Sequence, residues 1–262
     1  MFAKVLMIGD IVGKPGLLAL ENVLPKLLQK EKIDLVIANG ENAADGLGIT
    51  VEIATDMFTI GVDVITSGNH IFKKREIIKY LDKEPRILRP ANYPADKPGH
   101  GFITMSLDGY RIAVLNLEGK VFLNNIQSPF LAADEILPKL RSEVEAIFVD
   151  FHAEATSEKV ALARYLDGRV TAVIGTHTHV QTADEKVLPN GTAYITDVGM
   201  TGPIDSVIGV DVEKAIARFL SEDKLKYKIG SGDSQFEAVL ITFDTSSGKA
   251  TDIQPIQVLV PV

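Results

Sequence analysis

The sequence predicts an α/β fold that begins with a parallel sheet. Apolar, β-branched segments at residues 4–8, 35–38 and 64–67 have the length and composition of buried strands. Between them, residues 15–30 and 49–60 carry apolar side chains at helical spacing. Strands that alternate with helices in this way imply right-handed crossovers and a parallel sheet.

The middle of the chain predicts antiparallel pairing. Residues 73–81 form a short, charged helical segment, and four prolines then interrupt the chain: Pro85, Pro90, Pro94 and Pro98. Two strand-like segments, 102–107 and 111–117, flank Asp108-Gly109, which is a strong hairpin signal. We therefore expect the architecture to change from parallel to antiparallel near residue 100. A small cap-like insertion within about residues 72–142 is also expected.

The second half of the chain continues the alternation of helices and strands. The elements expected from periodicity and turn residues are a helix at 128–140, a strand at 146–151, a helix at 156–166, a strand at 170–174, a hairpin at Asn190-Gly191, a helix at 211–221, and closing strands at 236–243 and 253–260. Neither an internal repeat nor a low-complexity segment is present, so we expect a single domain over residues 1–262.

Composition excludes several classes of protein. The 262 residues carry a formal net charge of −8, which argues against a protein that coats long nucleic acid through Lys and Arg. With no cysteine, the chain can form neither a disulfide nor a thiolate metal site. Any metal must therefore take nitrogen and oxygen ligands, which suits iron, manganese or zinc.

No segment of the sequence has the pattern of a targeting or membrane-spanning element. The apolar start of the chain is short and leads directly into Gly9-Asp10, unlike a secretory signal. No apolar run approaches the roughly 20 residues needed to cross a bilayer. We therefore expect a cytoplasmic protein without a membrane partner.

Metal-binding residue types gather where the predicted strands end. The set comprises Asp10, Glu41, Asn42, Asn69, His70, His152, His177 and His179. It includes four of the five histidines of the chain, and only His100 lies elsewhere. The carboxyl edge of a parallel sheet is where α/β proteins bind ligands. Clustered His and carboxylate side chains at one such edge predict a metal site.

The segment Gly175-Thr176-His177-Thr178-His179 is the centre of this prediction. In an extended segment, residues two apart project to the same side, so His177 and His179 can reach one shared point. The whole set offers more ligands than one metal requires, which favours two metals with a bridging carboxylate. Two ions in this arrangement can activate a water and clamp the entering and leaving oxygens of a phosphoryl transfer.

The order of these segments resembles the calcineurin-like metallophosphoesterase superfamily. The motifs that carry the resemblance are Asp10, Asn39-Gly40-Glu41-Asn42, Gly68-Asn69-His70, His152 and Gly175-Thr176-His177-Thr178-His179. The superfamily usually begins with Asp-x-His and bridges its metals with Asp, where this chain has Asp10-Ile11-Val12 and Glu41. Both departures are similar to the bacterial YmdB-like branch, as are residues 9–13, 150–154 and 197–202.

The resemblance implies a fold and a set of residue roles. The implied fold is a metallophosphoesterase-like sandwich of two mixed β-sheets flanked by helices. The implied roles are Asp10, Asn42 and His179 on one metal, Asn69, His152 and His177 on the other, Glu41 as the bridge, and His70 as the acid that protonates the leaving oxygen. The implied metals are two divalent or trivalent ions, with iron expected and manganese or zinc as alternatives.

The resemblance also implies an activity, the hydrolysis of 2′,3′-cyclic nucleotides. The expected partners are a small phosphodiester substrate, a short RNA, and a second copy of the chain in a homo-oligomer. Alternatives are a broad phosphomonoesterase, a nuclease acting on short RNA, and a metal-loaded regulator that binds a nucleotide or RNA without turnover. In this scheme His70 is not a metal ligand, which favours catalysis over binding alone.

Overall fold

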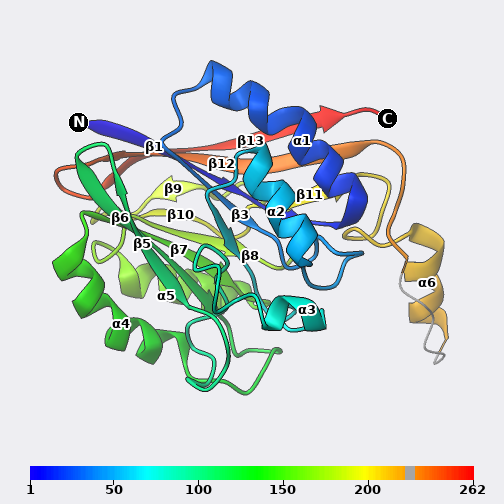
Figure 1. Cartoon of the computed structure of the whole chain (residues 1–262), viewed down its shortest axis with the longest axis horizontal. Helices are drawn as coiled ribbons and strands as arrows, with labels where there is room; N and C mark the ends of the chain where they lie inside the picture. The colour runs from blue at the N-terminus through cyan, green and yellow to red at the C-terminus, as the bar shows by residue number, and fades with distance from the viewer. Residues whose placement is uncertain (222–227) are drawn as a thin grey trace.

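Two β-sheets lie face to face between two layers of helices. The computed structural model describes residues 1–221 and 228–262. In Figure 1, α1 (Gly13–Lys30) and α2 (Val51–Ile60) cover one side of the paired sheets. On the other side lie α4 (Pro129–Glu143) and α5 (Thr156–Leu166). This four-layer arrangement is the α/β sandwich that the resemblance implied.

The first sheet contains the strands from both ends of the chain. Its order is β2 (Asp10–Ile11), β11 (Met200–Pro203), β12 (Ser234–Asp244), β1 (Phe2–Ile8), β3 (Leu35–Asn39) and β4 (Val64–Thr66), with β13 (Ala250–Val260) paired to β12. Strands β1, β3 and β4 are parallel, as the sequence predicted. The closing strands β12 and β13 pair antiparallel, and β12 also pairs antiparallel with β1.

The second sheet corrects one prediction. Its order is β5 (Phe102–Leu107), β6 (Tyr110–Glu118), β7 (Ala146–His152), β8 (Ala172–Thr176), β10 (Ala193–Ile195) and β9 (Lys186–Val187). The hairpins β5–β6 and β9–β10 are antiparallel, as expected. However, β6, β7, β8 and β10 are parallel, so the chain does not become antiparallel after residue 100. The hairpin signals are local, whereas the parallel pairings span the helical crossovers α4 and α5.

Two smaller helices lie outside the layers. The charged segment near residue 75 forms only the short α3 (Arg75–Ile78). At the right of Figure 1, α6 (Val212–Leu220) stands away from the sheets. Among the described residues, no helix is both long and apolar enough to cross a membrane. The single domain and the cap-like insertion stay predictions.

Alternation along the strands explains why the sheets stack. Successive side chains of a strand point to opposite faces. In β1, Val5 and Met7 therefore pack between the two sheets, whereas Leu6 and Ile8 pack beneath α1 and α2. In β6, Ile112 likewise faces the other sheet and Ala113 faces α4 and α5. Both faces of the central strands are thus buried, whereas β9 and β13 are partly exposed.

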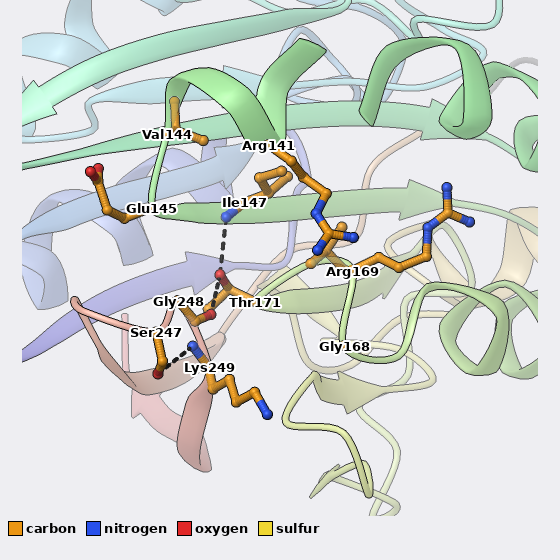
Figure 2. A pocket seen from close by; sticks show the side chains of 11 residues that line it. Arg141, Val144, Glu145, Ile147, Gly168, Arg169, Thr171, Ser247, Gly248 and Lys249 are labelled. Carbon is orange, nitrogen blue, oxygen red and sulfur yellow. Dashed lines mark hydrogen bonds between the residues drawn. The ribbon is translucent and has the colours of Figure 1, made fainter. Parts of the chain in front are cut away.

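The two ends of the second sheet differ in character. At the end where β7 and β8 begin, a hollow of about 200 Å³ is lined by charged side chains that include Arg141, Arg169 and Lys249. Figure 2 shows Thr171 at this hollow, bonded to the backbone of Ile147 and Gly248. The predicted metal ligands lie at the opposite end, where the same strands finish.

Candidate metal centre

The structure brings together every residue predicted for the site. The carboxyl ends of β1, β3 and β4 supply Asp10, Glu41, Asn42, Asn69 and His70, and those of β7 and β8 supply His152, His177 and His179. Each of these side chains lies within hydrogen-bond or ion-pair distance of another member. The site therefore lies across the two sheets, at the edge where both finish.

One group of candidate ligands surrounds the ring of His152. Its Nε2 lies 3.1 Å from Glu41 Oε1, 3.2 Å from Asn69 Oδ1 and 2.9 Å from His177 Nδ1. Glu41, His152 and His177 each place one potential ligand atom within 4.8 Å of the others. A carboxylate, an amide oxygen and two imidazoles facing one point form a donor set suited to a transition metal.

The other group lies on the opposite side of Glu41. Asn42 Nδ2 lies 3.4 Å from Glu41 Oε1 and 3.1 Å from His179 Nε2. Asp10 Oδ1 lies 3.8 Å from the same nitrogen of His179. Glu41 thus contacts both groups, as a bridging ligand must.

His70 lies beside these groups with a ring that is partly open to solvent. Its Nδ1 lies 2.7 Å from Asn42 Oδ1 and 3.3 Å from Glu41 Oε1, and the side chain is 23% exposed. The backbone nitrogen of His70 also donates to Glu41 Oε2 at 3.1 Å. The ring is therefore anchored through Nδ1, which leaves Nε2 as the nitrogen available to a substrate.

Hydrogen bonds behind the site fix one nitrogen of each remaining ring. His152 Nδ1 lies 2.9 Å from Thr176 Oγ1, whose own proton is donated to Asp150. His177 Nε2 lies 3.0 Å from a carboxylate oxygen of Glu154. The acceptor for His179 Nδ1 is the carbonyl of Ile208, at 2.9 Å. In each case the other nitrogen faces the cluster, which is the arrangement typical of metal-binding histidines.

Charge in the cluster is arranged around buried carboxylates. Burial works to raise the pKa of Glu41, but the adjacent His152 outweighs it and holds that pKa well below its ordinary value. Burial works to lower the pKa of His152, and Glu41 instead raises that pKa to about 9. Burial, with the positive charge of His152, lowers the pKa of His177 to about 3. The buried carboxylates therefore require positive charge, which a proton on His152 or a metal cation can supply.

The carboxylate of Asp10 fits a cation by a separate observation. Burial raises the pKa of Asp10, and its Oδ1 is a buried atom with no hydrogen-bond partner in the described part of the chain. The other oxygen, Oδ2, accepts the backbone N–H of His177 at 3.0 Å. An unpaired buried oxygen is costly unless something else satisfies it. A metal between Asp10 and His179 would do so.

The structure adds contacts to which the sequence assigned no role. Glu154 holds His177, and Asp150 lies beneath the site, where it accepts from Thr66, Thr176 and Asn39. Glu154 follows His152 by only two residues, so its position near a strand end was a usable signal. By contrast, Asp150 lies inside β7, and nothing in the local sequence distinguishes it from a residue facing a helix.

Residues 6–256 match the profile of the YmdB-like proteins. The chain belongs to the YmdB-like family. A 2′,3′-cyclic-nucleotide 2′-phosphodiesterase of Bacillus subtilis (strain 168) is 47% identical over 253 residues, which cover 97% of this chain and 96% of that protein.

Two solved structures are also similar over nearly their full lengths. A hypothetical protein from Thermus thermophilus has a TM-score of 0.93 and 41% identity, and the match covers 98% of this chain and 100% of that chain. A structure described as a novel phosphatase from Mycoplasma pneumoniae has a TM-score of 0.94 and 32% identity, and the match covers 100% of this chain and 95% of that chain.

These comparisons confirm the predicted family, the fold class and a hydrolase of phosphoric esters. Membership of a metallophosphoesterase family implies divalent metal ions, which agrees with the clustered ligand atoms of Glu41, His152 and His177. The identity of the metals, the roles of individual residues, the homo-oligomer, the short-RNA partner and the cytoplasmic location stay predictions.

Proposed function

We propose that this YmdB-like protein hydrolyses 2′,3′-cyclic nucleotides at a dinuclear metal centre. The observation that carries the proposal is the position of Glu41 Oε1, which lies close both to His152 Nε2 and to the amide of Asn42. The named activity of the Bacillus subtilis relative supports the choice of substrate. Iron is the metal that we propose, with manganese or zinc as alternatives for a nitrogen and oxygen donor set.

The residues proposed as ligands form two sets that share one carboxylate. Asp10, Asn42 and His179 would hold one ion, Asn69, His152 and His177 would hold the other, and Glu41 would contact both. When bound, the ions would supply an activated water and neutralise charge on the phosphate oxygens. The protein side chains orient these groups through the hydrogen bonds described above.

His70 is proposed as the general acid. Hydrolysis breaks a bond between phosphorus and a ribose oxygen, and the departing oxygen needs a proton. In the structure His70 Nδ1 donates to Oδ1 of Asn42, so Nε2 is the nitrogen left to face the departing oxygen. Turning the Asn42 amide by 180° would bring its oxygen to a cation and its nitrogen to His70 Nδ1. That contact would keep the ring proton on Nε2.

Substitution of His70 tests this role. We expect His70→Asn to lower turnover of 2′,3′-cyclic AMP about 10²- to 10⁴-fold, with metal content unchanged. His100→Asn is the matched control, because His100 is exposed and belongs to no part of the site. Near-normal turnover in His70→Asn would refute the acid role.

A panel of substrates tests the choice of ester. Purified wild-type protein would be assayed with 2′,3′-cyclic AMP, AMP and a short oligonucleotide under the same conditions. We expect the cyclic ester to be hydrolysed fastest. Faster hydrolysis of AMP would favour a phosphomonoesterase, and faster cleavage of the oligonucleotide would favour a nuclease. Tight nucleotide binding without turnover would indicate a regulator.

A further inference from the structure

A fully buried ion pair lies behind the metal centre, and no step proposed above uses it. Lys159 of α5 is 1% exposed, and its Nζ lies 2.7 Å from Oδ2 of Asp197, which is 0% exposed. Removing two charges from water has a large desolvation free energy. The attraction between the charges offsets it only when the geometry is good and further hydrogen bonds are made. The hydrogen bonds of Asp197 show which part of the backbone the ion pair holds in place.

The Oδ2 atom of Asp197 binds Thr178, the residue between the candidate ligands His177 and His179. It accepts the backbone N–H of Thr178 at 3.0 Å and the hydroxyl of Thr178 at 2.7 Å. Strand β8 ends at Thr176, and on either side of Thr178, His177 has φ 98° and His179 has φ 64°, so this segment is not the extended one expected from the sequence. Residues other than glycine rarely adopt this left-handed region, and they remain there only when the surrounding structure holds them. Asp197 supplies that restraint.

The second oxygen of Asp197 acts on the other side of the site. Asp197 Oδ1 accepts the backbone N–H of Gly199 at 2.9 Å, and the carbonyl of Gly199 accepts the N–H of Asp10 at 3.1 Å. Asp10 in turn accepts the N–H of His177 through Oδ2. One buried carboxylate is therefore connected to Asp10 through Gly199, and to His177 and His179 through the Thr178 that lies between them.

We propose that Asp197, neutralised by Lys159, is a positioning residue for the metal centre. It sets the backbone of Asp10 and of the loop from His177 to His179 before a metal binds. Its carboxylate is occupied by Lys159, Thr178 and Gly199, so it acts through these neighbours. The inference rests on the metal site proposed above.

Thr178→Val tests the inference with little risk to the fold. Valine keeps the β-branched shape of threonine and removes only the hydroxyl that Asp197 accepts. We expect Mn²⁺ to bind Thr178→Val about tenfold more weakly than wild type, a loss typical of residues that support metal ligands. Thr178→Ser restores the hydroxyl and should return the affinity to near the wild-type value.

Thr171→Val is the matched control. Thr171 precedes β8 at its opposite end, and its buried hydroxyl makes two backbone hydrogen bonds (Figure 2). We expect this variant to lose stability and to keep its Mn²⁺ affinity. If stability alone governed metal binding, both valine variants would weaken Mn²⁺ binding in proportion to their loss of stability, and the inference would be wrong.

Asp197→Asn gives a stronger form of the same test. Asparagine keeps only one acceptor oxygen, so its NH2 group must face either Thr178 and Lys159 or the N–H of Gly199, and we expect a greater loss of Mn²⁺ affinity than in Thr178→Val. Each protein would be titrated with Mn²⁺ at a temperature where circular dichroism shows it fully folded. Wild-type affinity in folded Thr178→Val would overturn the positioning role. A wild-type protein that does not bind Mn²⁺ or any other transition metal would instead overturn the metal site, and the positioning role with it.

Discussion

The contact between Glu154 and His177 offers a sharp test of how the second ligand group is built. Glu154 Oε2 lies 3.0 Å from His177 Nε2, while His177 Nδ1 faces His152. A carboxylate in this position fixes the tautomer of the ring and raises the basicity of the nitrogen that binds metal. We therefore expect Glu154→Ala to weaken metal binding.

The structure limits the size of this effect. Loss of such a supporting partner typically costs about 10- to 100-fold in metal affinity. Glu154 is 48% exposed, so water screens the contact and can replace part of it. We expect a loss near the lower end, about tenfold for Glu154→Ala. Glu154→Gln keeps an oxygen that can accept from His177 Nε2, so it should lose about half as much in free energy.

Titration with Mn²⁺ in competition with a chelator measures both variants against wild type. Glu213→Gln on the exposed α6 is the control for the change in net charge. Equal losses in Glu154→Gln and Glu213→Gln would show that overall charge is responsible. An unchanged affinity in Glu154→Ala would refute the claim that this carboxylate orients His177.

Two further predictions concern His152. In Gly68→Ala the new methyl group would lie 2.0 Å from His152 Cδ2, so we expect the ring to be displaced and Mn²⁺ affinity to fall at least tenfold in a direct titration. The second prediction is a pH dependence in chelator-treated protein. Burial works to lower the pKa of His152, but Glu41 raises it from the ordinary 6.5 to about 9. A pKa that is raised in the folded protein stabilises the fold at low pH. Its contribution, at most about 3 kcal/mol, should therefore be lost between pH 6.5 and 9, and urea unfolding that shows constant or rising stability would contradict this.

The sequence predicted which candidate residues lie together better than it predicted the order of the sheets. Strand ends can be read from the point where an apolar run stops, and parallel strands deliver those ends to one edge. That reasoning identified residues as distant as Asp10 and His179 without any knowledge of strand order. The order itself depends on pairings such as β6 with β7, which no local pattern specifies.

Residues that support the site from within were harder to predict. Lys159 occurs in a helix with other charged residues, where a lysine is usually solvated. Its burial follows from the packing of α5 against β8 beside Asp197, which is a tertiary contact. The short strands β2 and β11 were also missed, because a parallel pairing of two residues leaves no periodic signal.

The division of ligands between the sheets has a consequence for the metal-free protein. The candidate ligands Glu41 and Asn42 follow a strand of one sheet, and His152 and His177 come from the other. A bound ion would therefore add a link between two sheets that already contact each other through apolar packing and polar contacts. Occupancy of the centre then adds to the cohesion of the sandwich, in proportion to the logarithm of free metal over its dissociation constant. Removal of the metal would thus weaken the contact between the two sheets and also abolish the proposed hydrolysis.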